Sequence, residues 1–203
     1  MKLFNKSPIE GSDRPLLDQA THLVTQNSLF PPFPPETRQI VLGMGCFWGA
    51  EKIFYKLDGI YITAVGYSGG TVKNPTYEEV CTGSTGHAEA VLIVYFPQLL
   101  ALKSILKLFF EMHDPTQLNR QGNDIGTQYR SLLTYETNEE KIQMEDALNM
   151  YNDTLKQAKK REVVTVIEPR GEFYYAEEYH QQYLIKNPYG YCNHGFNGVS
   201  CNL

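Results

Sequence analysis

Short apolar runs separated by amphipathic or polar stretches organise the middle of this 203-residue chain. The runs are rich in β-branched and aromatic residues and span residues 39–44, 60–67, 89–96, 129–135 and 162–169. Runs of this length predict strands buried in a sheet. The longest uninterrupted apolar segment, Ala90 to Phe96, is too short to cross a bilayer. We therefore expect a core built around a sheet, and no membrane association.

Helical spacing fills the stretches between these strands. The first helix is predicted after residue 46, with Ala50 and Phe54 on its apolar face, and the second over residues 98–113. A third is predicted over residues 137–160, where Thr137 and Glu140 form a capping box. The order over residues 39–135 is β-α-β-β-α-β. This order predicts an α+β fold, a ferredoxin-like split βαβ sandwich with one additional helix and strand.

The two ends of the chain differ from this middle part. Residues 1–38 are expected to form an extension, because the prolines of segment 29–35 exclude helix and central strand. We expect the two phenylalanines of this segment to hold the extension against the protein surface. Residues 39–203 are expected to be one catalytic domain. Its end, residues 188–203, contains three glycines and is predicted to be a mobile tail.

Composition narrows the class of protein. The formal net charge of −5 gives no electrostatic reason to bind nucleic acid or an anionic membrane. Residues 1–6 start with positive charge but lead into no apolar segment, so no secretory signal is expected and the cytoplasm is the expected location. A reducing compartment favours catalysis over structural disulfides for the four cysteines. The spacing of Cys192, His194 and Cys201 fits zinc poorly, and no metal is expected.

Cys46, in the segment Gly45-Cys46-Phe47-Trp48-Gly49, is the candidate nucleophile. It lies where a strand ends and a helix begins, so backbone N–H groups can stabilise a thiolate there. Two large aromatic side chains, Phe47 and Trp48, stand beside the sulfur. The alternative is an inert cysteine buried among core aromatics, and local sequence alone does not decide between the two.

Further polar candidates lie in two loops and at the start of a strand. Glu89 opens an apolar strand and is either exposed at its tip or buried with a raised pKa, in which case it can act as a general acid. From this segment alone the exposed position is favoured. Tyr77 and Tyr129 offer phenolic donors, while Asp124 is either a functional group or a turn former.

Together these segments resemble a known family. The matching blocks are Gly45-Cys46-Phe47-Trp48-Gly49-Ala50-Glu51, Gly66-Tyr67-Ser68-Gly69-Gly70, Asn74-Pro75-Thr76-Tyr77, Gly86-His87-Ala88-Glu89-Ala90-Val91, Asn123-Asp124-Ile125-Gly126-Thr127-Gln128-Tyr129-Arg130-Ser131, His180-Gln181-Gln182-Tyr183-Leu184 and Asn187-Pro188-Tyr189-Gly190-Tyr191-Cys192. In this order they resemble the A-type peptide-methionine sulfoxide reductases, which act on the S epimer. The resemblance covers residues 39–201.

The resemblance implies an activity and a role for each candidate. Cys46 would attack the sulfoxide sulfur of oxidised proteins, peptides or free methionine sulfoxide and become a sulfenic acid. Phe47 and Trp48 would hold the substrate methyl group, Glu89 would donate a proton, and Tyr77 and Tyr129 would bind the sulfoxide oxygen beside Asp124. His87 would position its loop without a catalytic part, and no cofactor is implied.

The resemblance also implies a disulfide relay. Cys192 would form a disulfide with Cys46, and Cys201 would then exchange into it and present a Cys192–Cys201 disulfide to thioredoxin. The spacer between these two cysteines, residues 193–200, is slightly longer than the family's. Cys81 is expected to be a buried bystander.

Three alternatives remain from the residues themselves. A cysteine hydrolase or amidase would pair Cys46 with a base such as His87. A thiol peroxidase would share the sulfenic acid but need no aromatic methyl pocket. A redox-sensing or binding module without turnover would keep the disulfides. Consumption of methionine sulfoxide with a thiol reductant separates the reductase from all three.

Overall fold

A computed structural model of the protein describes residues 9–203. Residues 1–6, on which the expectation of no secretory signal rests, lie outside the described residues. The strands are β1 (Arg38–Met44), β2 (Ile60–Ser68), β3 (Ala88–Tyr95), β4 (Arg120–Gln121), β5 (Asp124–Ile125), β6 (Ser131–Tyr135), β7 (Val166–Pro169) and β8 (Phe173–Tyr175). The helices are α1 (Phe47–Phe54), α2 (Tyr77–Cys81), α3 (Leu102–Met112), α4 (Asn138–Gln157) and α5 (Tyr183–Lys186), with 3₁₀ turns at Thr127–Tyr129 and Glu178–His180.

Six of the strands form one mixed sheet in the order β7-β6-β1-β3-β2-β8. The four central strands pair antiparallel throughout, β8 extends the sheet antiparallel on β2, and β7 extends it parallel on β6. The mixed α/β class predicted from the sequence is confirmed. Strands β4 and β5 make a separate small hairpin between α3 and β6.

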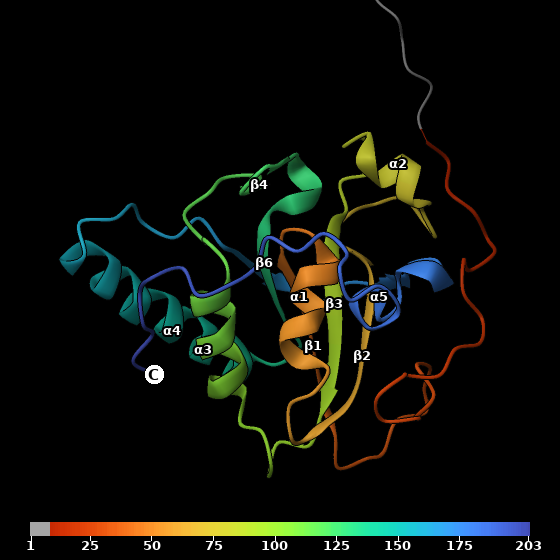
Figure 1. The fold of residues 1–203 in the computed structure, drawn as a ribbon, viewed down its shortest axis with the longest axis horizontal. Coiled ribbons are helices and arrows are strands. Elements are labelled where there is room, and N and C mark those ends of the chain that lie inside the picture. The colour runs from red at the N-terminus through yellow and green to blue at the C-terminus, as the bar shows by residue number, and fades with distance from the viewer. Residues whose placement is uncertain (1–8) are drawn as a thin grey trace, which may run out of the picture.

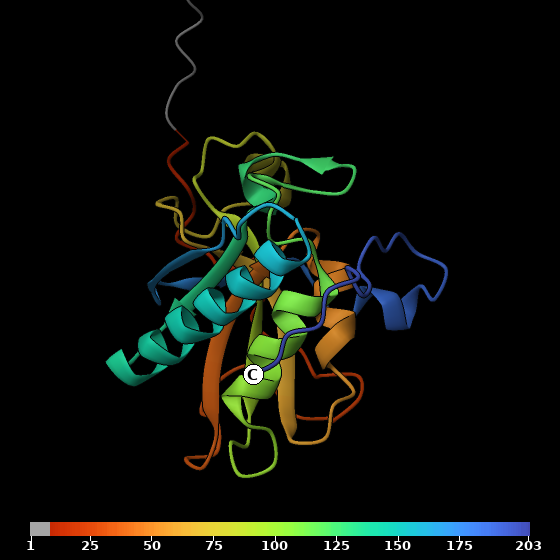
Figure 2. The same cartoon turned by 90° about the vertical axis from the view of Figure 1, so that its left-hand side faces the viewer.

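Successive side chains of a strand point to opposite faces of the sheet, and both faces of this sheet are apolar. Strand β3 is buried over its whole length. Val91 and Ile93 join the main core with α1, α3 and α4, which lie together over the sheet in Figure 1 and, from the side, in Figure 2. Leu92 and Val94 face a second cluster, which includes Leu29 of the extension. The extension therefore covers one face of the sheet, and its Phe30 and Phe33 pack against that cluster.

The tail, whose glycines predicted a mobile segment, is docked against the helices in this structure. Asn197 donates hydrogen bonds from Nδ2 to the Phe110 and His113 carbonyl oxygens, at 2.7 and 2.6 Å. Its Oδ1 accepts a hydrogen bond from the Tyr151 hydroxyl of α4 at 3.0 Å. Glycine content predicted freedom of the backbone, but these side-chain contacts fix the segment against α3 and α4.

None of the helices in the described part of the chain is both long and apolar enough to span a membrane.

Candidate functional site

The site lies where β1 ends and β3 begins, because these two strands run antiparallel as neighbours in the sheet. Gly45 connects β1 to α1 with φ of +93°, a conformation that favours glycine, and a Cβ there would collide with Gln121. Cys46 is the residue directly before α1 and is 8% exposed. The strand-to-helix turn thus places the Cys46 sulfur beside the start of β3.

Burial raises the pKa of the Cys46 thiol, and the Glu89 carboxylate raises it further. Hydrogen bonds from the backbone N–H groups of Trp48 and Gly49 act in the opposite direction but do not outweigh burial. The N–H groups at the helix start therefore favour the thiolate, while burial favours the protonated thiol and has the larger effect. A Cys46 thiol must lose its proton before its sulfur can act as a nucleophile.

Glu89 is buried, not exposed at the tip of its strand. Its side chain is 2% exposed, and Tyr67 of β2 is its cross-strand partner. Glu89 Oε2 accepts a hydrogen bond from the Phe47 N–H at 2.9 Å. Burial raises the pKa of Glu89 to about 8, although the Phe47 N–H lowers it. The carboxyl group is thus largely protonated at neutral pH and can donate a proton.

Two phenols face the same carboxyl group. Tyr77 begins α2, and Tyr129 ends a 3₁₀ turn; both are half-buried. Burial raises both pKa values, and the charge of Glu89 adds to the shift in each. Both tyrosines therefore keep their protons at neutral pH and can donate hydrogen bonds.

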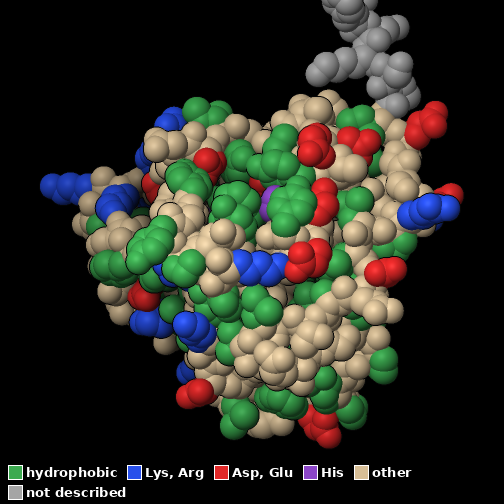
Figure 3. All heavy atoms as spheres, turned by 45° about the vertical axis from the view of Figure 1, so that its right-hand side comes forward, with side chains coloured by type: hydrophobic (Ala, Val, Ile, Leu, Met, Phe, Trp, Pro, Cys, Tyr) green, Lys and Arg blue, Asp and Glu red, His purple; other side chains and the backbone are tan. Residues whose placement is uncertain are grey.

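Two aromatic side chains, Phe47 and Trp48, follow Cys46 directly at the start of α1. Phe47 is 1% exposed, and its ring centroid lies 6.5 Å from that of Trp48 and 5.9 Å from that of Tyr67. Trp48 is half-buried and stacks on Tyr183, with centroids 3.9 Å apart. Hydrophobic side chains gather on this side of the molecule beside acidic ones (Figure 3). The rings provide an apolar wall next to the Cys46 thiol.

Asp124 joins the site to the tail. It accepts hydrogen bonds from the Asn193 Nδ2 at 2.8 Å and from the Tyr191 hydroxyl at 3.2 Å. Its charge also raises the pKa of Glu89 and of Cys46. Asp124 therefore lies close enough to affect Glu89 and Cys46, and it is also a docking point for the tail.

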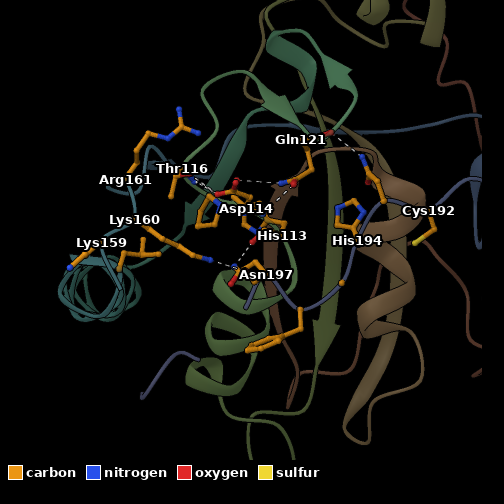
Figure 4. Close-up of a pocket in the computed structure, with 15 residues that line it drawn as sticks. His113, Asp114, Thr116, Gln121, Lys159, Lys160, Arg161, Cys192, His194 and Asn197 are labelled. Atoms are coloured by element: carbon orange, nitrogen blue, oxygen red, sulfur yellow. Dashed lines mark hydrogen bonds between the residues drawn. The ribbon is translucent and has the colours of Figure 1, made fainter. Parts of the chain in front are cut away.

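Residues of the tail also line a large cleft. Cys192, Asn193 and His194 line this cleft, which has a volume of about 780 Å³ (Figure 4). His194 Nε2 lies 2.6 Å from the Met44 carbonyl oxygen. The ring of His194 occupies the space that a Cβ on Gly49 would need. Cys192 is half-buried and carries a free thiol.

Cys201 lies apart from this cleft and is fully buried. Its backbone N–H donates to Glu111 Oε1 at 2.7 Å, and its carbonyl oxygen accepts from Lys107 Nζ at 2.8 Å. Burial raises the pKa of the Cys201 thiol to about 11. The structure does not bring Cys201 to the site with the other candidates.

Two further residues considered in the sequence, Cys81 and His87, lie in defined environments. Cys81 is exposed, so the expectation of a buried bystander is wrong. His87 accepts the Gly70 N–H at Nδ1 and binds the Val72 carbonyl oxygen through Nε2 at 2.7 Å, which confirms its loop-positioning role. With both ring nitrogens committed, His87 offers no free base to a hydrolase. Among residues 9–203, no cluster of three or more His, Cys, Asp or Glu side chains could hold a metal ion.

Sequence reasoning assigned no role to the segment that supports Trp48. His180 is 1% exposed, and its Nδ1 accepts the Trp48 Nε1–H at 3.0 Å. Glu177 Oε1 accepts the Tyr77 N–H, and its Oε2 accepts the Tyr67 hydroxyl, each at 2.9 Å. The block His180-Gln181-Gln182-Tyr183 could have indicated this support. It belongs to the family resemblance and carries two ring side chains, although it lies far in sequence from Cys46.

Comparisons with known proteins agree with this geometry. The family model described as peptide methionine sulfoxide reductase matches residues 38–200. A peptide methionine sulfoxide reductase MsrA of Brucella anthropi is 50% identical over 195 residues, which cover 96% of this chain and 89% of the relative. The structure resembles methionine sulfoxide reductase A of Corynebacterium diphtheriae, with a TM-score of 0.86, 39% identity and coverage of 99% of this chain and 98% of that one.

A second solved relative is Mxr1 of Saccharomyces cerevisiae in its reduced form. It matches with a TM-score of 0.74 and 36% identity, over 83% of this chain and 96% of the yeast chain. A family model and a half-identical relative, each spanning most of the chain, agree on the same assignment. The chain belongs to the peptide methionine sulfoxide reductase family.

Proposed function

We propose that this protein reduces the S epimer of methionine sulfoxide, free or within oxidised proteins and peptides, to methionine, with Cys46 as the nucleophile. The observation that carries the residue roles is the pairing of two buried groups: the Cys46 thiol before α1 and the Glu89 carboxyl, bonded to the Phe47 N–H at 2.9 Å. The family assignment supplies the reaction, and this pairing supplies the groups that perform it.

The first step uses both protons of the resting site. Glu89, protonated below its pKa of about 8, gives its proton to the sulfoxide oxygen, and Tyr77 and Tyr129 donate hydrogen bonds to that oxygen. The Cys46 thiol proton passes to the Glu89 carboxylate as the sulfur attacks. The attack forms a bond between the Cys46 sulfur and the substrate sulfur. The protonated oxygen then passes to the Cys46 sulfur, so that this sulfur–sulfur bond and the substrate's sulfur–oxygen bond both break. Methionine leaves, and Cys46 carries the oxygen as a sulfenic acid.

The aromatic wall selects the substrate. Phe47 and Trp48 are proposed to hold the terminal methyl group, since an apolar pocket of fixed shape receives a methyl in preference to a polar substituent. With the methyl in that pocket and the oxygen at Glu89, only one of the two epimers presents its sulfur to Cys46.

Recycling follows through the tail. Cys192 attacks the Cys46 sulfenic acid, a disulfide forms and water leaves. The Cys201 thiol then exchanges into this disulfide, freeing Cys46, and a thioredoxin dithiol reduces the Cys192–Cys201 pair. Because Cys201 starts fully buried and bonded to Glu111, the residues around it must undock before this exchange.

Three finer assignments belong to the same proposal. The central order β6-β1-β3-β2, with antiparallel neighbours, supports a ferredoxin-like core over residues 39–135. Residues 39–203 are proposed as one catalytic domain with residues 1–38 as its extension. The four free thiols fit a reducing compartment, and we propose the cytoplasm.

Chiral chromatography of a blocked methionine sulfoxide, with both epimers present, tests the proposal. Incubation with the purified protein and dithiothreitol should consume the S epimer alone. Cys46→Ser should abolish that consumption, while Cys81→Ser, which changes an exposed cysteine but keeps a hydrogen-bonding group beside Tyr77, should preserve it. Persistence of both epimers with a folded, reduced protein would exclude the reductase and direct attention to acyl-transfer and peroxide assays.

A further inference from the structure

Trp48 is the only tryptophan in the chain, and its indole ring is held from two sides. One face stacks on Tyr183, with ring centroids 3.9 Å apart and planes inclined by 15°. The ring edge donates a hydrogen bond from Nε1 to His180 Nδ1 at 3.0 Å. Both partners come from residues 180–183, so one short segment determines how the indole lies.

The hydrogen bond fixes the chemical state of His180. An indole N–H can only donate, so Nδ1 must be unprotonated and the ring proton sits on Nε2. Burial lowers the pKa of His180 to about 4, which keeps the ring neutral. Nε2 lies 3.7 Å from Glu177 Oε2 and has no hydrogen-bond partner among residues 9–203.

His180 is itself held in place by its neighbours. Its ring centroid lies 5.0 Å from that of Phe47, 4.8 Å from that of Tyr77 and 4.1 Å from that of Tyr179. The imidazole thus contacts the proposed methyl pocket on one side and a proposed oxygen-binding tyrosine on the other. Rotation of this ring would disturb both.

The protein core anchors the segment that carries His180. Gln181 pairs its side chain with the Val65 N–H and C=O, at 2.9 and 2.8 Å. Gln182 donates its N–H to Glu51 Oε2 at 2.9 Å and its Nε2 to Glu51 Oε1 at 2.8 Å. The segment is therefore bonded to β2 and to α1, the helix that begins after Cys46.

We propose that His180 is a positioning residue: its Nδ1 acceptor sets the orientation of the Trp48 indole and thereby the shape of the pocket for the substrate's methyl group. This role rests on the proposed function of Trp48 in methyl binding. His180 does not need to touch the substrate for it. The contacts predict an effect on substrate binding more than on the chemical step.

A pair of substitutions separates the acceptor from the ring. His180→Phe keeps a ring but removes the acceptor, whereas His180→Asn loses the ring and places an amide oxygen near the position of Nδ1. In single-turnover reactions without reductant, His180→Phe should raise the half-saturating substrate concentration about tenfold, the effect of one buried hydrogen bond. The maximal rate should change little, because binding is weakened equally before and in the transition state. His180→Asn should restore binding to within about threefold of the unsubstituted protein.

Trp48 fluorescence gives a second readout that needs no turnover. Since no other tryptophan contributes, the emission reports on this indole alone. His180→Phe should move the emission maximum to shorter wavelength, because the indole loses its polar partner, and His180→Asn should resemble the unsubstituted protein. If the emission follows this pattern while no protein reduces sulfoxide, the proposed function fails and the Trp48–His180 contact stands.

Other patterns contradict the proposal. If His180→Phe behaves as the unsubstituted protein and His180→Asn is impaired, ring packing is what matters. Equal impairment of both, or none in either, also overturns the acceptor role. Because a substitution in a buried ring cluster can prevent folding, the unsubstituted protein labelled with ¹⁵N provides an independent check. Its single indole signal should show coupling through the hydrogen bond to His180 Nδ1, and absence of that coupling would refute the contact.

Discussion

The Glu89 carboxyl group and the Phe47 amide are joined by a 2.9 Å hydrogen bond that connects the start of β3 to the first residue of α1. Cys46 directly precedes that amide, so one contact places the proposed acid next to the proposed nucleophile. Both groups are buried, and burial raises both pKa values. At neutral pH the site therefore holds two protons, one on sulfur and one on the carboxyl group.

Removing the carboxyl proton should stop the chemistry without unfolding the protein. Glu89→Gln keeps an oxygen that can accept the Phe47 N–H but cannot donate an acidic proton. We expect the single-turnover rate of sulfoxide reduction to fall about a hundredfold or more, the usual contribution of a positioned general acid. Thermal unfolding followed by circular dichroism should show an intact fold. An unchanged rate in the folded variant would remove Glu89 as the acid.

The pH dependence of the first step should also report on the Glu89 proton. Glu89 has a pKa raised to about 8, so it donates a proton below that pH and loses the ability as pH rises through it. The single-turnover kcat/KM for the S epimer should therefore decline above about pH 8. Glu89→Gln should lack this decline and keep its low rate throughout. A decline of the same midpoint in Glu89→Gln would assign it to another group.

Cys192→Ser should separate the reduction step from recycling. The variant keeps Cys46 and should consume one equivalent of the S epimer per protein, then stop when thioredoxin, its reductase and NADPH are the only reductants. Cys81→Ser is the matched control, since its thiol is exposed and plays no proposed part. Sustained turnover of Cys192→Ser with thioredoxin would argue against the relay.

Thiol labelling should report on the docked tail. In the reduced protein, an alkylating reagent should modify exposed Cys81 well before Cys201, which is fully buried and has a pKa raised to about 11. Peptide mass spectrometry over time measures the order. Gly49→Ala should speed the labelling of Cys192, because a Cβ there collides with the His194 ring and displaces the tail. Rapid labelling of Cys201 in the unsubstituted protein would contradict the docked tail.

Much of the fold could be predicted from local patterns. The central strands and α4 were found because their apolar or helical periodicity is long, and the Thr137–Glu140 capping box is present. Helix α3 begins at Leu102, not at residue 98 as predicted, so Leu99 lies outside it and is 70% exposed. Short elements were missed: α2, β8 and α5 have too few residues for periodicity and depend on contacts with distant segments.

The site was predictable in its residues but less so in its chemistry. Motif resemblance named Cys46 and Glu89, yet the exposed position favoured for Glu89 was wrong, because burial depends on neighbours that a strand's own sequence does not reveal. The same holds for Cys201, whose glycine-containing segment predicted freedom while Glu111 and Lys107 hold its backbone. His180 was seen within a motif, but its role follows only from its contact with Trp48.

The most direct test of the account is to locate the oxygen after one turnover. Cys192→Ser, reduced and freed of reductant, would be mixed with one equivalent of the S epimer, trapped with dimedone and analysed by peptide mass spectrometry. The account predicts stoichiometric methionine release and a dimedone adduct on Cys46 alone, with neither after the R epimer. Methionine release with no adduct on Cys46, or an adduct on Cys81 or Cys201 instead, would contradict it.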